Sequence, residues 1–253
     1  MRKLFISLFI LLAQISFAKE VSITSLDGFK LVGFIEYPKE KKEKYPLVIL
    51  VHQFGTDHKI WSEFAKELRE KGYATLLIDL RGHGLSIYQN GKENKIVFKP
   101  NFKSALDLMN FFKKSNEKVN FKKIPEDISL WIDYVAENEK VDLDNIILIG
   151  ASLGGISIIP VVTVQDIKAL VSISPGSISI VGKEAVEIAL ASYENPVLYI
   201  VSKNDPLGSY KTVDTLMGMT NNGYALTVSG SGHGVILLPK TKAYIFTFLE
   251  NLK

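Results

Sequence analysis

The chain of 253 residues contains no cysteine, four histidines and two tryptophans. The lack of cysteine excludes a disulfide scaffold, a thiolate zinc site and a cysteine nucleophile. The four histidines are scattered and form no His-Glu-x-x-His motif, so we expect no metal ion and no other cofactor. Hydrophobic residues make up 47% and charged residues 23%, and these globular proportions exclude a wholly disordered chain.

The first 18 residues have the layout of a secretory signal peptide. A positive start at Arg2 and Lys3 is followed by an apolar stretch over residues 4–12, and small residues then stand at Ser16 and Ala18. The alternative is an uncleaved membrane anchor, but the apolar stretch is short for a membrane span. We therefore predict cleavage after Ala18, export to the periplasm or the medium, and no stable membrane span after cleavage.

Removal of the signal peptide leaves 28 basic and 27 acidic side chains, a formal charge of +1. Such a nearly neutral protein lacks the basic field on which general nucleic-acid binding depends, so no nucleic-acid partner is expected. No internal repeat is visible, and no Pro/Ser/Gly-rich linker divides the remainder. Residues 19–253 are therefore predicted to form a single domain.

Strand and helix patterns alternate along this domain. A hairpin that turns at Asp27-Gly28 is predicted first, and helical spacing follows at residues 59–71, 125–139 and 237–252. Apolar runs typical of strands covered on both faces occupy residues 47–52, 74–80, 146–149, 169–173, 197–201 and 225–228. This order predicts an α/β fold with a mostly parallel, doubly wound sheet and an antiparallel N-terminal hairpin. Reactive residues are then expected beyond the carboxyl ends of the strands.

One pentapeptide has the form of a nucleophile elbow. Gly150-Ala151-Ser152-Leu153-Gly154 follows the apolar strand at residues 146–149 directly. A sharp turn from strand to helix exposes the serine oxygen above the sheet, and it needs small neighbours because the two backbones pass close together. The alternative is a small-residue loop in which Ser152 only caps a helix.

A serine nucleophile needs a base, an orienting carboxylate and donors for the oxyanion. His233 stands in a glycine-rich loop after the last predicted strand, and Asp205 closely follows the strand at residues 197–201, with Asp214 as its main rival. Serine, acid and histidine in this chain order are typical of such an elbow. One oxyanion donor is expected from the backbone of Leu153, and the other from the loop at residues 52–55.

These motifs together resemble the α/β-hydrolase superfamily, most closely its dienelactone-hydrolase-like and esterase- or lipase-like branch. The resemblance spans roughly residue 45 to the C-terminus and rests on His52-Gln53-Phe54-Gly55, Asp79 to Ser86, Gly150 to Gly155, Asp205 and His233. It implies Ser152 as nucleophile, His233 as general base and Asp205 as the partner of His233. It also implies oxyanion donors on the main chain of Phe54 and Leu153, and a structural role for the loop that contains His83.

Two departures from the family pattern bear on activity. Family members commonly have His-Gly where this chain has His52-Gln53, so the loop must avoid or tolerate a strained backbone there. The side chain of Gln53 is a candidate donor to the substrate. Dienelactone hydrolases proper use a cysteine nucleophile, so that specific activity does not carry over.

Residues 85–124 form an unusual insertion, whereas only residues 175–181 lie where many members carry a large cap. The insertion holds nine lysines and three acidic residues, a net +6. Aromatic residues alternate with these lysines, and a helical face is predicted between Pro100 and Lys113-Lys114, formed by Phe102, Ala105, Met109 and Phe112. One interpretation is a solvated amphipathic helix packed on the body. The other is a partial lid beside Ser152 that attracts anionic or lipid-like substrates.

The sequence therefore predicts a secreted serine hydrolase that cleaves small carboxylic esters through an acyl-enzyme on Ser152. A serine peptidase or amidase with the same triad is the chemical alternative. A non-catalytic module that binds carbohydrate or the cell envelope is the alternative from another class, since a fold by itself does not determine function.

Overall fold

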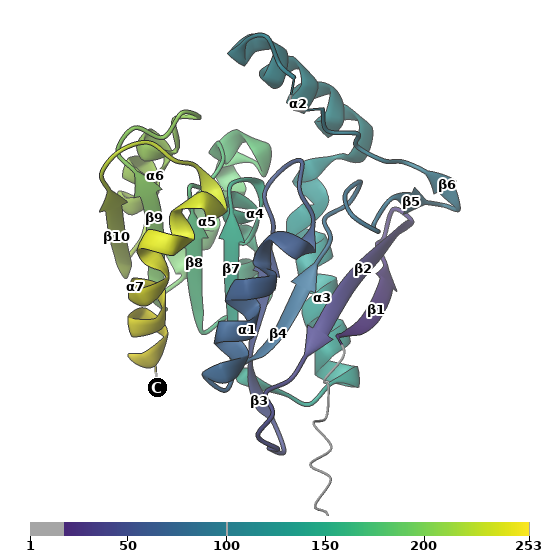
Figure 1. The fold of residues 1–253 in the computed structure, drawn as a ribbon, viewed down its shortest axis with the longest axis vertical. Coiled ribbons are helices and arrows are strands. Elements are labelled where there is room, and N and C mark those ends of the chain that lie inside the picture. The colour runs from purple at the N-terminus through teal and green to yellow at the C-terminus, as the bar shows by residue number, and fades with distance from the viewer. Residues whose placement is uncertain (1–17, 100, 253) are drawn as a thin grey trace, which may run out of the picture.

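A sheet of ten described strands forms the centre of the molecule (Figure 1). The computed structural model describes residues 18–99 and 101–252, so the predicted signal peptide lies outside the described residues except for Ala18. In spatial order the strands are β10 (Gly223–Val228), β9 (Val197–Ser202), β8 (Ala169–Ile173), β7 (Val141–Ala151), β3 (Tyr45–Val51), β4 (Ala74–Ile78), β2 (Phe29–Glu36), β5 (Tyr88–Gln89) and β6 (Lys92–Glu93). The remaining strand, β1 (Lys19–Thr24), pairs with β2.

Neighbouring strands run parallel from β10 to β4 and antiparallel from there to β6. Every residue of β4, β8 and β9 is buried, as expected for parallel strands covered on both faces. β1 and β2 form the antiparallel hairpin around Gly28, whose φ of 89° suits glycine at a tight turn. The predicted fold class is confirmed.

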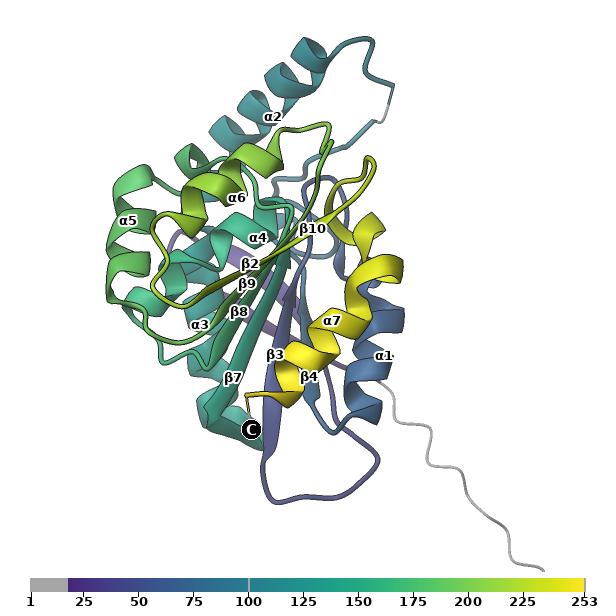
Figure 2. The same cartoon turned by 90° about the vertical axis from the view of Figure 1, so that its left-hand side faces the viewer.

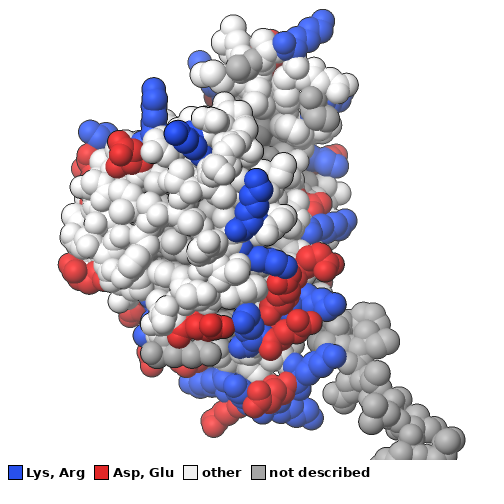
Figure 3. All heavy atoms as spheres, turned by 60° about the vertical axis from the view of Figure 1, so that its left-hand side comes forward, with Lys and Arg blue, Asp and Glu red and all other residues white. Residues whose placement is uncertain are grey.

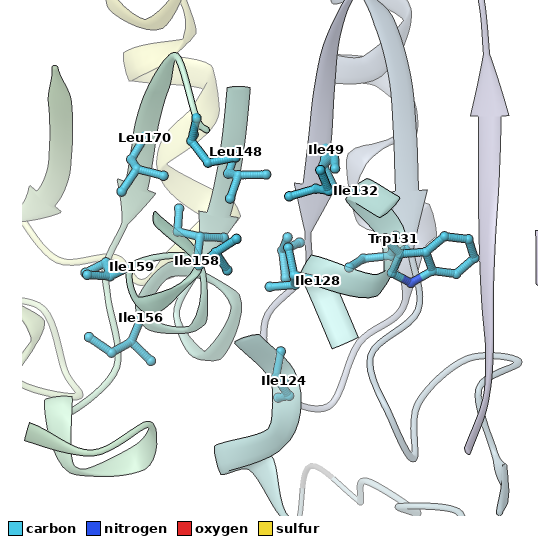
Figure 4. Close-up of a cluster of buried hydrophobic side chains, with 14 of the residues drawn as sticks. Ile49, Ile124, Ile128, Trp131, Ile132, Leu148, Ile156, Ile158, Ile159 and Leu170 are labelled. Atoms are coloured by element: carbon cyan, nitrogen blue, oxygen red, sulfur yellow. The ribbon is translucent and has the colours of Figure 1, made fainter. Parts of the chain in front are cut away.

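Helices cover both faces of the sheet (Figure 2). α1 (Ser62–Glu70) and α7 (Leu238–Glu250) lie on one face; α3 (Ile124–Asn138), α4 (Leu153–Ser157), α5 (Lys183–Ser192) and α6 (Ser209–Met217) lie on the other. Figure 4 shows isoleucines of α3 and α4 beside Ile49 of β3, Leu148 of β7 and Leu170 of β8. Trp131 of α3 lies against Gly33 of β2 instead. Short 3-10 helices are η1 (His58–Trp61), η2 (Phe121–Lys123), η3 (Pro160–Thr163), η4 (Ile178–Ile180) and η5 (Gly234–Leu237). Among the described residues no helix has the length and apolar character needed to cross a membrane.

The insertion forms α2 (Ala105–Val119), which projects beyond the body at the upper end of Figure 1. The prediction for this helix is wrong in its bounds and its face. Ser104 caps the N-terminus by accepting the Asp107 N–H, so Phe102 lies outside the helix. The helix continues past Lys113 and Lys114 and ends at Asn120, whose left-handed backbone stops it. Met109 is 66% exposed, whereas Phe112 packs on the core.

The connection from β8 to α5 contains only the single turn of η4, and no large cap is evident in the described structure.

The loop from Asp79 to Ser86 is held from two sides. Arg81 is 1% exposed and makes a bidentate pair with Asp127 of α3, with both N···O distances at 2.7 Å. It also bonds Asp27 in the N-terminal hairpin. These charge-assisted bonds fix the loop whose His83 accepts the Gly55 N–H.

Candidate active site

Ser152 occupies a sharp turn between β7 and α4. Its φ of 50° and ψ of −111° are unusual for a residue with a side chain. The flanking glycines explain how this turn fits. A Cβ on Gly150 would lie 2.5 Å from the Gly154 carbonyl oxygen, and one on Gly154 would lie 2.3 Å from that of Val51. Strand and helix can approach this closely only without those side chains, and the turn lifts Ser152 above the end of the sheet.

The structure brings His233 and Asp205 to Ser152. His233 Nε2 lies 2.7 Å from Ser152 Oγ, and His233 Nδ1 lies 2.9 Å from Asp205 Oδ2 and 3.0 Å from Oδ1. A carboxylate can only accept here, so Nδ1 carries the proton and Nε2 is free to accept the serine hydroxyl proton. The three residues come from loops after β7, β9 and β10, at the carboxyl ends of parallel strands.

The Asp205 side chain is fully buried, and the His233 side chain is 14% exposed. Burial by itself favours the neutral acid, but the hydrogen bond and charge of His233, together with the Leu207 N–H, outweigh it. The pKa of Asp205 is therefore held below its ordinary value. Asp214, the predicted rival, is exposed on α6 and forms no contact with His233.

The predicted oxyanion donors lie on two adjoining segments. Leu153 is the first residue of α4, where backbone N–H groups have no acceptor within the helix. The Phe54 N–H makes no hydrogen bond to any described residue. Gly154 brings the start of α4 against the carbonyls of Val51 and His52, directly before the loop that carries Phe54. The two predicted donors therefore stand on neighbouring segments of the fold.

The loop departs from the family pattern without strain at Gln53. The positive φ falls on Gly55, at 76°, and not on Gln53. The Gln53 side chain crosses to the histidine loop, where its Oε1 accepts the Val235 N–H at 3.1 Å. A Cβ on Gly234 would lie 2.0 Å from this oxygen, so the contact requires glycine beside His233. The predicted substrate-binding residue is thus placed as a tether between two loops.

Two buried histidines link the loop at residues 52–55 to the loop from Asp79 to Ser86. His52 Nε2 accepts the Leu80 N–H at 3.0 Å, and His83 Nε2 accepts the Gly55 N–H at 3.2 Å. Burial lowers the pKa of both imidazoles, that of His83 to about 3. Both side chains are therefore neutral acceptors near pH 7. The sequence offered no signal for the His83 contact, because 28 residues separate its partners.

The insertion reaches the site through Phe54. Its ring contacts Phe112 with centroids 5.0 Å apart and Phe98 at 5.6 Å, and it also touches Phe111 and Phe121. Phe98 packs directly on Gly55, where a Cβ would lie 2.6 Å from its ring. The segment predicted as a possible lid is therefore in contact with the loop of the expected oxyanion donor. Within the described residues no cluster of side chains is arranged to bind a metal ion.

The family model for the alpha/beta hydrolase fold matches residues 46–185, more than half of the chain. The chain belongs to the α/β-hydrolase family. The match runs from β3 into α5 and so includes the loop at residues 52–55 and the turn at Ser152. The resemblance predicted from the motifs is thereby confirmed.

Solved structures from several bacteria superimpose on most of the chain. Est1E from Butyrivibrio proteoclasticus, solved with ferulic acid bound, is 22% identical, with 90% of this chain and 98% of that chain covered and a TM-score of 0.65. An acetyl xylan esterase from a Paenibacillus species is 16% identical over 92% and 83%, with a TM-score of 0.65. A dienelactone-hydrolase-like protein from Klebsiella pneumoniae is 18% identical over 86% and 87%, with a TM-score of 0.64. No curated protein matches this α/β hydrolase by sequence.

Proposed function

We propose that this α/β hydrolase is an exported serine hydrolase that cleaves carboxylic esters through an acyl-enzyme on Ser152. The observation that carries the proposal is the continuous hydrogen-bond chain from Ser152 Oγ through His233 to Asp205, with steps of 2.7 and 2.9 Å. Such a chain activates a hydroxyl that is otherwise a weak nucleophile. It also argues against a non-catalytic binding module, which has no need of a serine, a base and a carboxylate in this order.

In the proposed reaction Ser152 Oγ attacks the ester carbonyl carbon while His233 Nε2 accepts the hydroxyl proton. The N–H groups of Phe54 and Leu153 stabilise the negative charge on the carbonyl oxygen. The bond to the alcohol oxygen then breaks, and His233 returns the proton to the leaving alcohol. Water attacks the acyl-enzyme with His233 again as base, which releases the acid and restores Ser152. Asp205 keeps the imidazole oriented and stabilises its positive charge throughout.

Ester substrates are favoured over peptides by two observations. The structural neighbours include an acetyl xylan esterase, whose name states an ester as its substrate. In addition, no large cap closes the described site, and the surroundings of Phe54 are aromatic and apolar. The basic insertion beside this site points to small esters with an anionic or lipid-like group. Export follows from the proposed signal peptide at residues 1–18.

The test is labelling with a fluorophosphonate probe, which reacts with activated serines. We expect the wild-type protein to be labelled and Ser152→Ala to show no labelling, with Ser177→Ala, an exposed serine on the same side, as the matched control. Labelled peptides identified by mass spectrometry should contain Ser152. Labelling that persists in Ser152→Ala would overturn the proposal.

Hydrolysis of p-nitrophenyl esters of increasing chain length, compared with matched p-nitroanilides, separates esterase from amidase activity. We expect turnover of the esters to exceed that of the anilides. Export is tested by determining the N-terminal residue of the protein recovered from the periplasm or the medium. We expect it to be Lys19, the residue after the predicted cleavage position.

A further inference from the structure

The two edges of the sheet differ in how they are protected. On the N-terminal side the outermost strands are β1, which pairs with β2 and carries Lys19 and Glu20, and β6, a strand of two residues that are both charged, Lys92 and Glu93. The other edge is β10, six residues long with the sequence GYALTV, which contains no charge and no proline. Exposed edges in soluble proteins are normally blocked by shortness, charge or proline, because they can pair with another chain. β10 has none of these protections.

The backbone of β10 leaves one set of polar groups open to a partner strand. On the inner side the carbonyls of Asn222 and Val228 accept N–H groups of Val197 and Lys203, at 2.9 and 2.8 Å. Backbone groups alternate in direction along a strand, so the even-numbered residues face β9. The N–H and C=O groups of Gly223, Ala225 and Thr227 therefore point outward, and no described residue pairs with them.

The groove beside this edge is lined by uncharged, mostly apolar residues. Between β10 and α7 lies a groove of about 480 Å³ whose lining includes Leu226, Tyr244 and Phe248 and no charged residue. Tyr224 is 53% exposed and Tyr244 59% exposed, although both are large aromatics. Figure 3 looks onto this side of the molecule, where an uncharged white area fills much of the centre. Acidic and basic residues lie around it, at the lower end, along the right-hand side and at the upper edge. A contiguous uncharged surface of this kind marks a protein–protein contact.

We propose that the protein forms a homodimer in which β10 pairs antiparallel with β10 of a second copy across a twofold axis. A twofold axis between two identical edge strands makes them antiparallel. Both strands then form hydrogen bonds through the same outward-facing N–H and C=O groups. With Ala225 on the axis, Ala225 pairs with its own copy, and Gly223 pairs with Thr227 on both sides. These are the three outward-facing positions, so all become hydrogen-bonded pairs.

The same register arranges the side chains. Tyr224 then lies opposite Leu226 of the second copy in a non-hydrogen-bonded pair, where side chains are closest. Tyr224 contacts Phe248 of α7, with centroids 6.1 Å apart, so this pair lies on the α7 side of the sheet, over the groove. The neutral surface brings no like charges together in a symmetric contact. An identical strand therefore completes both the backbone pairing and the apolar groove, and a twofold contact closes without leading to fibres.

The absence of cysteine makes a site-specific test direct. In the proposed register the two Ala225 Cα atoms lie about 5.5 Å apart, which is within the range that a disulfide spans. Ala225→Cys in the full chain should give a disulfide-linked dimer rapidly under mild oxidation. Ile188→Cys, at a similarly exposed apolar position on α5, is the matched control and should form no disulfide-linked dimer on the same time scale. Equal cross-linking of the two variants would overturn the register.

Sedimentation over a range of protein concentrations tests the interface itself. We expect the wild type to dimerise, and both Tyr224→Lys and Ala225→Pro to raise the dissociation constant at least tenfold. Proline at Ala225 removes an outward N–H and should leave the monomer folded, which circular dichroism checks. Ile188→Lys should dimerise like the wild type. A protein that is monomeric at every concentration, or a dimer insensitive to Tyr224→Lys, would refute the proposal, and neither result bears on the role of Ser152.

Discussion

Gln53 Oε1 accepts a hydrogen bond from the Val235 N–H, and this bond joins two loops separated by 182 positions in the sequence. One loop carries Phe54, the proposed oxyanion donor, and the other carries His233, the proposed base. The side chain fills the space left by Gly234, whose φ of 64° turns the backbone toward it. A residue that departs from the family pattern thus connects the two halves of the proposed catalytic machinery.

Removing this tether should slow catalysis more than it weakens binding. Gln53→Ala loses one hydrogen bond worth about 1 kcal/mol, so we expect kcat to fall about 5- to 10-fold with a smaller change in KM. Gln53→Glu keeps an acceptor for Val235 and should recover most of the turnover. Its added negative charge beside His233 should shift the acidic limb of the pH–rate profile to higher pH.

Steady-state kinetics across pH measure both effects. Gln165→Ala is the matched control, because that side chain bonds Ser129 and Asp133 far from the site. A Gln53→Ala variant with wild-type kcat would show that the tether has no catalytic role.

Asp205 is expected to orient His233, and Asp214 is not. Asp205→Asn replaces an acceptor of the Nδ1 proton by an amide, which favours the wrong tautomer, so kcat should fall by about 10⁴. Asp214→Asn, on the exposed face of α6, should retain full activity. Steady-state turnover of a p-nitrophenyl ester measures both, with circular dichroism as the check on folding. Comparable losses in the two variants would reject the assignment.

His83 should make the protein less stable in acid. Burial lowers its folded-state pKa to about 3, whereas the pKa of the unfolded chain is close to 6.5. Between these values the unfolded state binds the extra proton, so the free energy of unfolding falls as the pH is lowered. The slope from one such group is at most about 1.4 kcal/mol per pH unit.

Urea denaturation of wild type and His83→Phe between pH 4 and pH 8 tests this contribution. The variant should be less stable at pH 8, because the Gly55 N–H loses its acceptor, but its stability should depend less on pH. His52, whose pKa is also lowered, is still present and keeps part of the slope. Parallel curves for the two proteins would contradict the expected titration.

The basic insertion should make catalysis of anionic esters sensitive to salt. Lys113, Lys114 and Lys118 are exposed on α2, and exposed charges are screened over about 10 Å at 0.1 M salt. We expect kcat/KM for an anionic ester to fall as ionic strength rises, and that for a neutral ester of similar size to change little. Replacing the three lysines with glutamate should abolish the difference.

Replacing three other lysines with glutamate provides the control for net charge. These are Lys39, Lys41 and Lys44, in the exposed loop between β2 and β3. Equal salt responses of the two esters in the wild type would mean that the insertion is a solvated surface.

The order of elements and the position of the elbow are readable from the sequence because they depend on local patterns. Apolar runs of strand length indicate burial on both faces, and the small residues around Ser152 indicate a close crossing of strand and helix. The chain order of Ser152, Asp205 and His233 then follows from the parallel topology, which places all three after strands at one edge. The helix of the insertion is predicted with wrong bounds, because its end is placed at Lys113 and Lys114. Lysines are as compatible with the interior of a helix as with its end.

What the tertiary structure decided is which distant groups meet. Alone, the sequence leaves Asp205 and Asp214 both open as partners of His233, and only the fold shows that one is buried against the imidazole while the other faces solvent. The contacts of Gln53 with Val235, of His83 with Gly55 and of Phe54 with the aromatic residues of the insertion are equally absent from any local pattern. Each contact joins segments far apart in the chain. These segments meet because the parallel strands bring the loops that follow them together at the same end of the sheet.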